Sequence, residues 1–471
     1  MRQIVSQGRG LIATMILIVV CSGVVQGYLT PLLPVVGAHV GVGGVGQNNL
    51  YLLSQVVCAV LTPLLARWGD MWGHRRLLLV AVAMVAVGSL LIAVRPTTAT
   101  LAVGMVLQGA VVGFFPLLAG ILRSRSPENG RVGMSVLVGA LLLSIGTGGF
   151  VAGSLSDEHA LAGLWTAVPF SALALAAAFV LPTSTAPRAG RFNAPAALLL
   201  TVGLGALILA LTEGGSWGWA SASTLLTLVG SLVVLAVWVR VERRSSHPLV
   251  SIRMLGNRRL AAVSAHAFCI AFGAIGFLGA NAVYLGTEPD GDGLGLGLGA
   301  RAISLVSLGM VAVGFVGSTL TPRLARAIGD RAVLMAGGFV GGLGFLSLCL
   351  FHSSLPRYLV GALIVGLSTG MFEASTRSLS VEVVDEAETA LSVGVNEMAL
   401  SLGAAIGAAV IGSLWAGHTS AEGTVTGAGY QAAWAACAIV ALVGAAVGLL
   451  LRQSPAAPAP EAGVATAGRA V

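Results

Sequence analysis

Long apolar stretches alternate with short polar segments from one end of the chain to the other. About fourteen of these stretches are long enough to form membrane-spanning helices, which need roughly 20 apolar residues to cross the hydrocarbon layer. Their approximate centres lie at residues 22, 56, 84, 111, 142, 171, 203, 230, 271, 309, 342, 368, 403 and 440. The pattern therefore predicts an all-α polytopic membrane protein with 14 transmembrane helices.

The composition agrees with this prediction. Hydrophobic residues make up 56% of the 471 residues and charged residues only 9%, and the mean hydropathy is +0.94. A soluble core does not need so much apolar surface. The first stretch follows Arg2 and Arg9, as the apolar region of a signal peptide would, but it lacks a convincing cleavage site and many spans follow it. We expect this stretch to be retained as the first helix.

The positions of the basic residues predict the orientation in the membrane. All 25 are arginines, and all but Arg95, Arg301 and Arg357 are assigned to the two tails or to the loops that follow an even-numbered stretch. The positive-inside rule makes these segments cytoplasmic. We therefore expect a multi-pass protein of the cytoplasmic (inner) membrane with both termini in the cytoplasm. No basic stripe carries interleaved aromatic residues, so the net charge of +7 does not indicate nucleic-acid binding.

The chain also repeats itself with an offset of 256 to 257 residues. The matched pairs include Arg67 with Arg323, Gly73 with Gly329, Gly109 with Gly366, and Gly113 with Gly370. Such a repeat is typical of two parallel six-helix halves, which account for twelve spans and leave two in between. We predict an N-terminal half over 1–185, two extra linking helices over 186–256, a C-terminal half over 257–452 and a disordered cytoplasmic tail over 453–471.

A short basic segment between two apolar runs, Arg67-Trp-Gly-Asp70-Met-Trp-Gly73-His-Arg75-Arg76, is the most informative motif. It resembles the loop between spans 2 and 3 of the major facilitator superfamily, with the pattern G-x-L-a-D-r-x-G-r-K/R. The acid, the second glycine and the following base match, whereas Ala66 and Trp68 replace the first glycine and the leucine. We expect a cytoplasmic gate of charge-assisted bonds that must break for the site to open inward. Its candidate residues are Arg67, Asp70, Gly73, Arg75, Arg76 and Arg131.

The two extra helices narrow the resemblance. The segments 192–195, 212–219 and 247–253 are similar to the central region of the fourteen-span drug:proton antiporter branch, and the resemblance covers most of residues 11–452. It implies an efflux permease that works by alternating access between two halves. Heavy use of alanine, glycine, valine and arginine, with no lysine, indicates a GC-rich coding sequence. The sequence thus favours an actinobacterial-type multidrug or antibiotic exporter.

Two residues depart from the branch at positions that matter for proton coupling. Val25 stands where span 1 usually carries an acid, and Met105 stands where span 4 usually carries an arginine. A proton-driven exporter needs a buried group that changes charge between its two orientations. In this chain that group must lie elsewhere.

Three titratable residues within the apolar stretches are candidates for the proton carrier. Glu397 has no charged partner three or four residues away, whereas Glu373 precedes Arg377 by four residues and can pair with it on a helix. His266 is the third candidate, with a hydrogen-bonded core histidine as the alternative. For Glu397 the alternatives are a buried hydrogen-bonded carboxyl group or a gate between the halves.

Small residues recur at the spacing of close helix contacts. In lipid, helices associate through small residues that let their backbones approach. The span-5 glycines resemble the antiporter motif G-x-x-x-G-P-x-x-G-G, with glycine at the proline position. The set comprises Gly109, Gly113, Gly146, Gly149, Gly153, Gly366 and Gly370.

Sparse polar residues among apolar neighbours are candidates for a substrate cavity near the membrane midplane. Such a lining suits amphipathic small molecules with few ionic groups. The candidates, besides His266, are Gln26, Tyr28, Gln55, Gln108, Asn281 and Asn396.

Other kinds of activity find little support. No Walker motif and no catalytic triad or carboxylate pair is present, so neither ATP hydrolysis nor an enzyme is expected. The five cysteines are widely spaced in apolar runs, which argues against metal sites; we expect no cofactor. We expect a monomer whose partners are a small-molecule substrate, protons and the lipid bilayer. Two alternatives stay open: a uniporter or importer of a small metabolite, and a non-transporting membrane sensor or scaffold.

Overall fold

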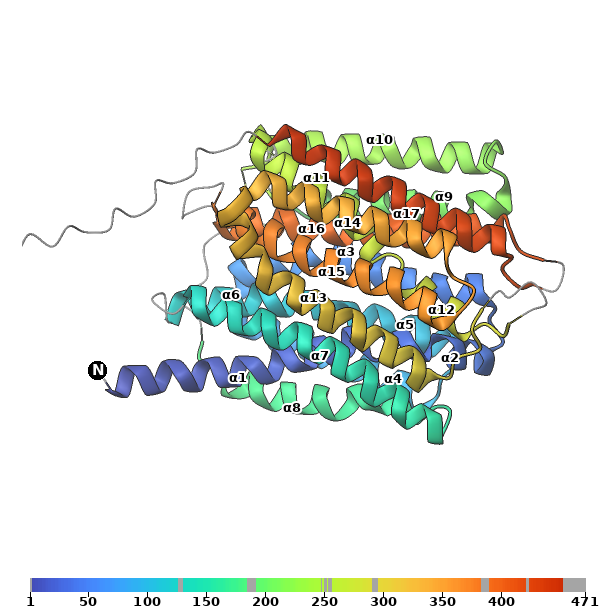
Figure 1. Ribbon diagram of the computed structural model, residues 1–471. Helices are drawn as coiled ribbons and strands as arrows, with labels where there is room; N and C mark the ends of the chain where they lie inside the picture. The colour runs from blue at the N-terminus through green and yellow to red at the C-terminus, as the bar shows by residue number, and fades with distance from the viewer. Residues whose placement is uncertain are drawn as a thin grey trace, which may run out of the picture.

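The computed structural model describes residues 2–125, 130–183, 192–246, 248–249, 252, 256–289, 295–382, 389–420 and 423–451. Within this part of the chain the structure is a bundle of long helices that run roughly parallel to one another (Figure 1). The predicted tail over 453–471 lies outside the described residues.

Three groups of helices follow one another along the chain. The first group is α1 (Arg2–Gly27), η1 (Thr30–Leu32), α2 (Leu33–Val40), α3 (Gly44–Trp72), α4 (His74–Val94), α5 (Thr98–Gln108), η2 (Gly109–Gly113), α6 (Phe114–Arg125), α7 (Gly130–Glu158), η4 (Ala162–Thr166) and α8 (Ala167–Val180). The linking pair is α9 (Ala194–Trp217) and α10 (Ala222–Arg244). The last group is α11 (Arg258–Ala274), α12 (Leu278–Gly286), α13 (Ala300–Ile328), α14 (Asp330–Leu350), α15 (Leu355–Glu382), α16 (Thr389–Ala416), α17 (Gly427–Val447) and η7 (Gly448–Leu450).

The described residues contain 14 helical segments that are long and apolar enough to cross a membrane. Each contains one of the centres expected from the sequence, so the predicted number and order of spans are confirmed. Several spans combine two or three consecutive elements, as in the first span, Gly10–Val40, which joins α1, η1 and α2.

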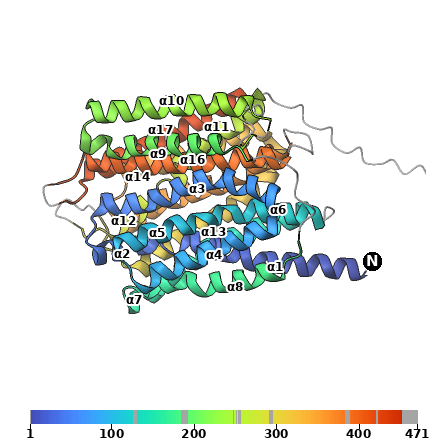
Figure 2. The ribbon, with the colours of Figure 1, turned by 180° about the vertical axis from the view of Figure 1, so that it is seen from behind.

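Two large clusters of buried side chains give the bundle two cores. One is drawn from α1 to α8, with Ala300 of α13 at its edge, and the other from α11 to α17. The two groups of helices meet where α7 packs on α13 and where α3 packs on α16. The linking pair lies at one side of the bundle, with α10 outermost and α9 between α10 and α16 (Figures 1 and 2).

Local sequence explains several helix boundaries. The side chain of Asn257 accepts hydrogen bonds from the backbone N–H groups of Arg259 and Leu260 at the start of α11, at 3.0 and 3.4 Å. The ninth span breaks between α11 and α12 at Gly276. A Cβ atom at this glycine would lie 2.9 Å from the carbonyl oxygen of Ala404 in α16, so the residue must be small for the helices to meet. The break thus lets α16 pack closely against the ninth span.

The predicted glycine faces lie at close helix contacts. A Cβ atom at Gly109 or Gly113 would lie 2.3 or 2.5 Å from the side chains of Val57 and Leu65 of α3. In the second half, a Cβ atom at Gly370 would lie 1.7 Å from the carbonyl oxygen of Gly314. At Gly366 it would lie 2.4 Å from the carbonyl oxygen of Met310, also in α13. The repeated glycines therefore make equivalent contacts in the two halves, on α3 and on α13.

The span-5 glycines face two different neighbours. Cβ atoms at Gly146 and Gly153 would contact α13, the first at the side chain of Leu308 and the second 2.5 Å from the carbonyl oxygen of Ala300. A Cβ atom at Gly149 would lie 3.1 Å from the carbonyl oxygen of Gly27 in α1. The position that carries proline in the resembling motif therefore packs within the first half, while its neighbours pack across the two halves.

Gly370→Ala is expected to destabilise the protein, because the added methyl group must push α15 away from α13. Overpacking of this kind typically costs about 1–3 kcal/mol. Gly139→Ala is the matched control, since a Cβ atom there would have no neighbour within 4 Å. Thermal unfolding of the two purified variants in detergent measures the effect. Equal melting temperatures would contradict the close contact between α13 and α15.

Candidate functional site

Three charged side chains meet inside the bundle between α15 and α16. Arg377 donates from Nε to Oε1 of Glu397 at 2.8 Å and from Nη1 to Oε2 of Glu373 at 2.9 Å. The side chains of Glu373, Arg377 and Glu397 are 16%, 23% and 27% exposed, so the cluster is mostly enclosed but not sealed. One guanidinium therefore serves two carboxylates, and the charged cluster has one acid in excess.

The cluster revises the expectation for Glu397. The sequence offers this residue no partner within its own helix, and the structure supplies one from α15. The pair of Glu373 with Arg377, expected from their spacing, is present. Arg377 was assigned with the loop arginines, but it lies within the twelfth span, Leu355–Ser380, and is held there by the two acids. Arg377 therefore belongs to the charged cluster within a span and is not a loop residue.

His266 lies apart from this cluster, in the packing of α11 against α17. Its side chain is fully buried, and Nδ1 lies 2.8 Å from the carbonyl oxygen of Gly444. Among the described residues, Nε2 has no hydrogen-bond partner. A group with no exposed surface has no direct route for exchanging a proton with water, which favours the core-histidine alternative.

Two of the cavity candidates contact each other inside the first half. The Gln108 Nε2 atom donates to the Tyr28 hydroxyl at 3.0 Å and to the Ser89 hydroxyl at 2.9 Å. The Ser89 hydroxyl in turn lies 3.3 Å from that of Ser171 in α8. Tyr28 and Gln108 are buried. They thus form an internal polar network that joins the residue after α1 to α4, α5 and α8.

The other cavity candidates are dispersed. Asn281 is buried in the second half, where its Oδ1 accepts a hydrogen bond from the hydroxyl of Tyr358. Gln26 is exposed on α1 and donates to Ser22 at 3.0 Å, and Gln55 is half-buried on α3. The expected single lining of Tyr28, Gln108 and Asn281 is therefore not what the structure presents, because each of these side chains is enclosed within its own half.

Asn396 occupies a different setting from the other candidates. Its side chain is fully buried, and neither amide atom has a hydrogen-bond partner among the described residues. Leaving buried polar groups unpaired typically costs about 1–3 kcal/mol each. Asn396 directly precedes Glu397, so this unpaired amide lies next to the charged cluster in α16. A costly group beside the site is a reason to expect a functional role for it.

The basic motif forms the turn between α3 and α4. Gly73 has φ of 95°, a backbone conformation that other residues rarely adopt, which explains the glycine at this position. Arg75 donates from Nη2 to the carbonyl oxygen of Phe179 at 2.5 Å, at the end of α8. Arg76 is exposed, and Arg67 is half-buried with its Nε unpaired among the described groups. The side chains of Asp70 and Arg131 lie outside the described part of the structure.

An aromatic stack accompanies this turn. Trp68, at the position where leucine is usual, stacks on Trp72 with ring centroids 5.7 Å apart, and its ring lies 5.2 Å from that of Phe192. Phe192 comes just before α9, whose start is capped by Asn193. The stack therefore ties the end of α3 to the start of the linking pair.

The opposite end of the bundle is closed by hydrogen bonds between the two halves. Asn48 of α3 donates from Nδ2 to the carbonyl oxygen of Ala408 in α16 at 2.8 Å. One turn further on, the Tyr51 hydroxyl donates to the carbonyl oxygen of Ile275, at the break between α11 and α12, at 2.7 Å. Asn48 and Tyr51 lie near the start of α3, a helix that packs on α2 and α12; α2 and α12 lie at the end of the bundle away from the N-terminus (Figure 1).

Sequence reasoning missed this closure, although a signal was present. Asn48, Tyr51 and Gln55 recur at intervals of three and four residues, which places them on one face of a helix. Only Gln55 was singled out. On α3 this polar stripe marks the face that contacts the other half of the bundle.

The sequence is similar to those of known membrane transport and drug resistance proteins. Residues 263–470 match the Major Facilitator Superfamily family. Multidrug resistance protein Stp of Mycobacterium tuberculosis is 27% identical over 399 residues, which cover 83% of this chain and 72% of Stp. The probable actinorhodin transporter of Streptomyces coelicolor is 27% identical over 390 residues, covering 78% of this chain and 65% of the relative.

Solved structures show the same fold. The nucleoside transporter NupG superposes with a TM-score of 0.64 at 14% sequence identity, covering 93% of this chain and 98% of NupG. The fourteen candidate spans describe a multi-pass membrane protein, and the actinorhodin and nucleoside proteins that it resembles are transporters. The chain is thus similar to proteins of the major facilitator superfamily.

Proposed function

We propose that this transporter exports amphipathic small molecules, of the drug, antibiotic or secondary-metabolite kind, in exchange for protons. The observation that supports the proposal best is the cluster in which Arg377 bridges Glu373 and Glu397. With both acids ionised the cluster carries one net negative charge, and a single proton neutralises it. The partial exposure of all three side chains gives such a proton a route in and out.

Within this cluster, Glu397 is our candidate for the proton carrier. It is the more exposed of the two acids and comes from a different helix than Arg377, so a shift of α16 against α15 can break its bond. Glu373 is tied to Arg377 within one helix and would stay paired during such a shift. Movement of α16 would thus change the charge environment of Glu397 selectively, which is what proton coupling requires.

The distribution of arginines supports an orientation with both termini in the cytoplasm and the protein in the inner membrane. In this orientation the bonds of Asn48 and Tyr51 hold the two halves together at the outer end, as alternating access requires of a conformation that does not face outward. The turn at residues 67–76 would then be the cytoplasmic gate, with Asp70 holding it shut in the other conformation. We further propose that the protein acts as a monomer, with 1–185 and 257–452 as the two moving halves and 186–256 as the linking helices.

Two relatives support the proposed substrate class by their names. Stp is a multidrug resistance protein, and the Streptomyces relative is a probable transporter of actinorhodin. The apolar interior with few polar groups suits amphipathic molecules. The competing candidate is a uniporter, favoured by Val25 and Met105, which are buried apolar residues where the resembling branch carries charges.

Everted membrane vesicles that contain this chain are expected to accumulate some members of a panel of dyes and drugs when respiration acidifies the vesicle interior. The proton gradient drives protons out of the vesicle and substrate into it. Accumulation should vanish when an ionophore dissipates the gradient, and vesicles without the protein serve as the control. Transport that persists unchanged after the gradient is lost would favour the uniporter, and accumulation equal to the control would contradict transport of these compounds.

A further inference from the structure

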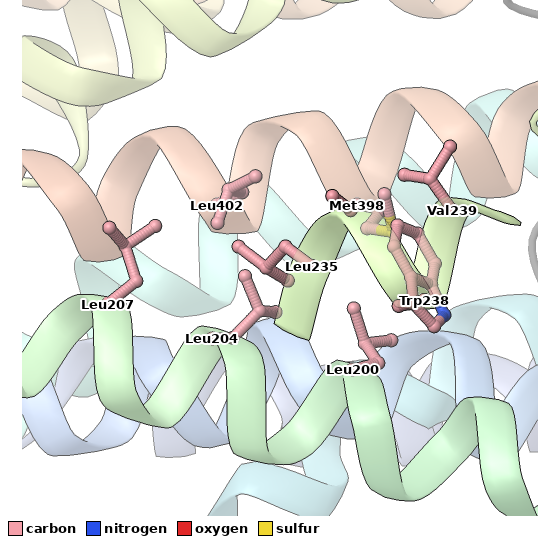
Figure 3. A pocket seen from close by; sticks show the side chains of 9 residues that line it. Leu200, Leu204, Leu207, Leu235, Trp238, Val239, Met398 and Leu402 are labelled. Carbon is pink, nitrogen blue, oxygen red and sulfur yellow. The ribbon is translucent and has the colours of Figure 1, made fainter. Parts of the chain in front are cut away.

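A cavity of about 240 Å³ lies between the linking pair and α16. Figure 3 shows the leucine side chains of α9 and α10, the ring of Trp238, and Met398 and Leu402 of α16 around it. Its lining residues are Leu200, Leu204, Leu207, Leu235, Ala236, Trp238, Val239, Met398 and Leu402. It exceeds the engineered apolar cavity of about 150 Å³ that binds benzene. The space is therefore large enough for part of a hydrocarbon chain.

The chemistry of the lining selects an apolar occupant. Its side chains are aliphatic or thioether groups, apart from the indole ring of Trp238. Trp238 is 7% exposed, and its indole N–H has no acceptor among the described residues. A ligand with several polar groups would leave them unpaired here, at a cost of about 1–3 kcal/mol each. An alkyl chain with at most one nearby acceptor fits this lining.

The position of α10 brings the membrane lipids to this cavity. Large apolar side chains along α10 are more than two-fifths exposed, and α10 lies at the outside of the bundle in both views (Figures 1 and 2). These side chains are Leu225, Leu226, Val229, Leu232, Val233 and Val237. In a bilayer this face contacts lipid acyl chains, and Ala236, which lines the cavity, is itself exposed on α10.

A group of arginines follows the cavity along α10. Arg240 comes directly after the lining residue Val239, and Arg243 and Arg244 form the last turn of the helix, about 7 Å further along its axis. All three are exposed. The acid in this turn, Glu242, is 2% exposed and accepts a hydrogen bond from Asn193 of α9 at 3.5 Å, so it is turned into the protein. The exposed charge at this end of α10 is therefore positive.

We propose that the cavity holds an acyl chain of an anionic phospholipid of the cytoplasmic leaflet, whose phosphate binds the arginines at the end of α10. The assignment to this leaflet rests on the proposed orientation, whereas binding itself does not. Basic residues beside a gap between helices are the usual recognition elements for anionic headgroups. Because Met398 directly follows Glu397 in α16, the bound chain would also fix the position of the helix that carries the candidate proton site.

The test measures binding of phosphatidylglycerol to the full chain by native mass spectrometry, with phosphatidylcholine as the neutral comparison. Leu204→Trp fills the cavity and should abolish retention of phosphatidylglycerol. Leu226→Trp is the control, since this residue also lies in the linking pair, on α10, but is 74% exposed and outside the lining. Equal retention by the two variants would overturn the proposal.

The headgroup is tested separately, with variants that do not touch the core. Arg240→Gln together with Arg244→Gln should weaken binding about 25-fold, at about fivefold for each arginine near the membrane surface. Arg323→Gln with Arg326→Gln, exposed on α13, should have little effect. Equal loss in both pairs, or equal retention of the neutral lipid by the parent, would show adsorption to any basic surface and overturn the site.

A second measurement covers the case in which Leu204→Trp does not fold. Phosphatidylglycerol brominated on its acyl chain should quench the fluorescence of Trp238, which is obtained as the difference between the parent and Trp238→Phe. Quenching of this component beyond that given by brominated phosphatidylcholine supports the proposal. The same quenching by both lipids contradicts it.

Discussion

Glu397→Gln abolishes uphill, pH-driven transport while leaving substrate exchange intact: this is the result that we expect from proteoliposomes. Glutamine keeps the size of the side chain and its ability to accept a hydrogen bond from Arg377, which lies 2.8 Å away, but it cannot ionise. The cluster then has one acid for one guanidinium, and the position assigned to the proton carrier can no longer change its charge. Accumulation driven by an imposed pH gradient is therefore expected to fall to the level of liposomes without protein.

Two measurements separate coupling from binding. Exchange of labelled for unlabelled substrate without a gradient should continue in the variant, because it needs the conformational change but no net proton movement. Glu288→Gln, on an exposed loop, is the matched control and should behave as the parent. Undiminished uphill transport by Glu397→Gln would exclude Glu397 as the carrier and assign the role to Glu373. A parent whose transport ignores the gradient would favour the uniporter.

Arg377→Gln is expected to cause the largest loss of stability among substitutions in the charged cluster. It leaves Glu373 and Glu397 facing each other without their shared cation. Removing one partner from a buried ion pair typically costs about 3–5 kcal/mol, and the partial exposure of these groups places the expected cost at the lower end. The melting temperature of the purified protein should fall clearly.

The double variant Arg377→Gln with Glu373→Gln tests the cause. It removes one of the two unpaired acids, so it should recover much of the lost stability if uncompensated negative charge is responsible. A double variant as unstable as the single one would mean instead that the packing of the arginine side chain, rather than its charge, holds α15 against α16.

The sequence was sufficient for the number, order and approximate centres of the spans, because a bilayer requires a long apolar helix for each crossing. It also located the Glu373–Arg377 pair, since a spacing of four residues on a helix fixes the contact. The bond between Arg377 and Glu397 is different. It joins residues 20 positions apart on separate helices, and nothing in the spacing specifies how α15 and α16 face each other.

The same limit explains the cavity candidates. Polar residues in apolar spans were taken to line one common space, but a polar side chain can equally be satisfied inside its own half. Gln108 forms hydrogen bonds with Tyr28 and Ser89, and Asn281 forms one with Tyr358. Whether a polar residue faces the interface or the interior of a half depends on helix rotation, which the apolar pattern of an almost entirely hydrophobic span defines only weakly.

The seal between the halves relies on main-chain acceptors. Asn48 and Tyr51 donate to the carbonyl oxygens of Ala408 and Ile275, and to no side chain of the second half among the described residues. Every residue type carries such an oxygen, so relatives can replace the residues at 275 and 408 without removing the acceptors, provided that the helices keep their paths. Evolution can therefore vary the C-terminal wall of the transport route widely, to suit new substrates, while two side chains of α3 preserve closure.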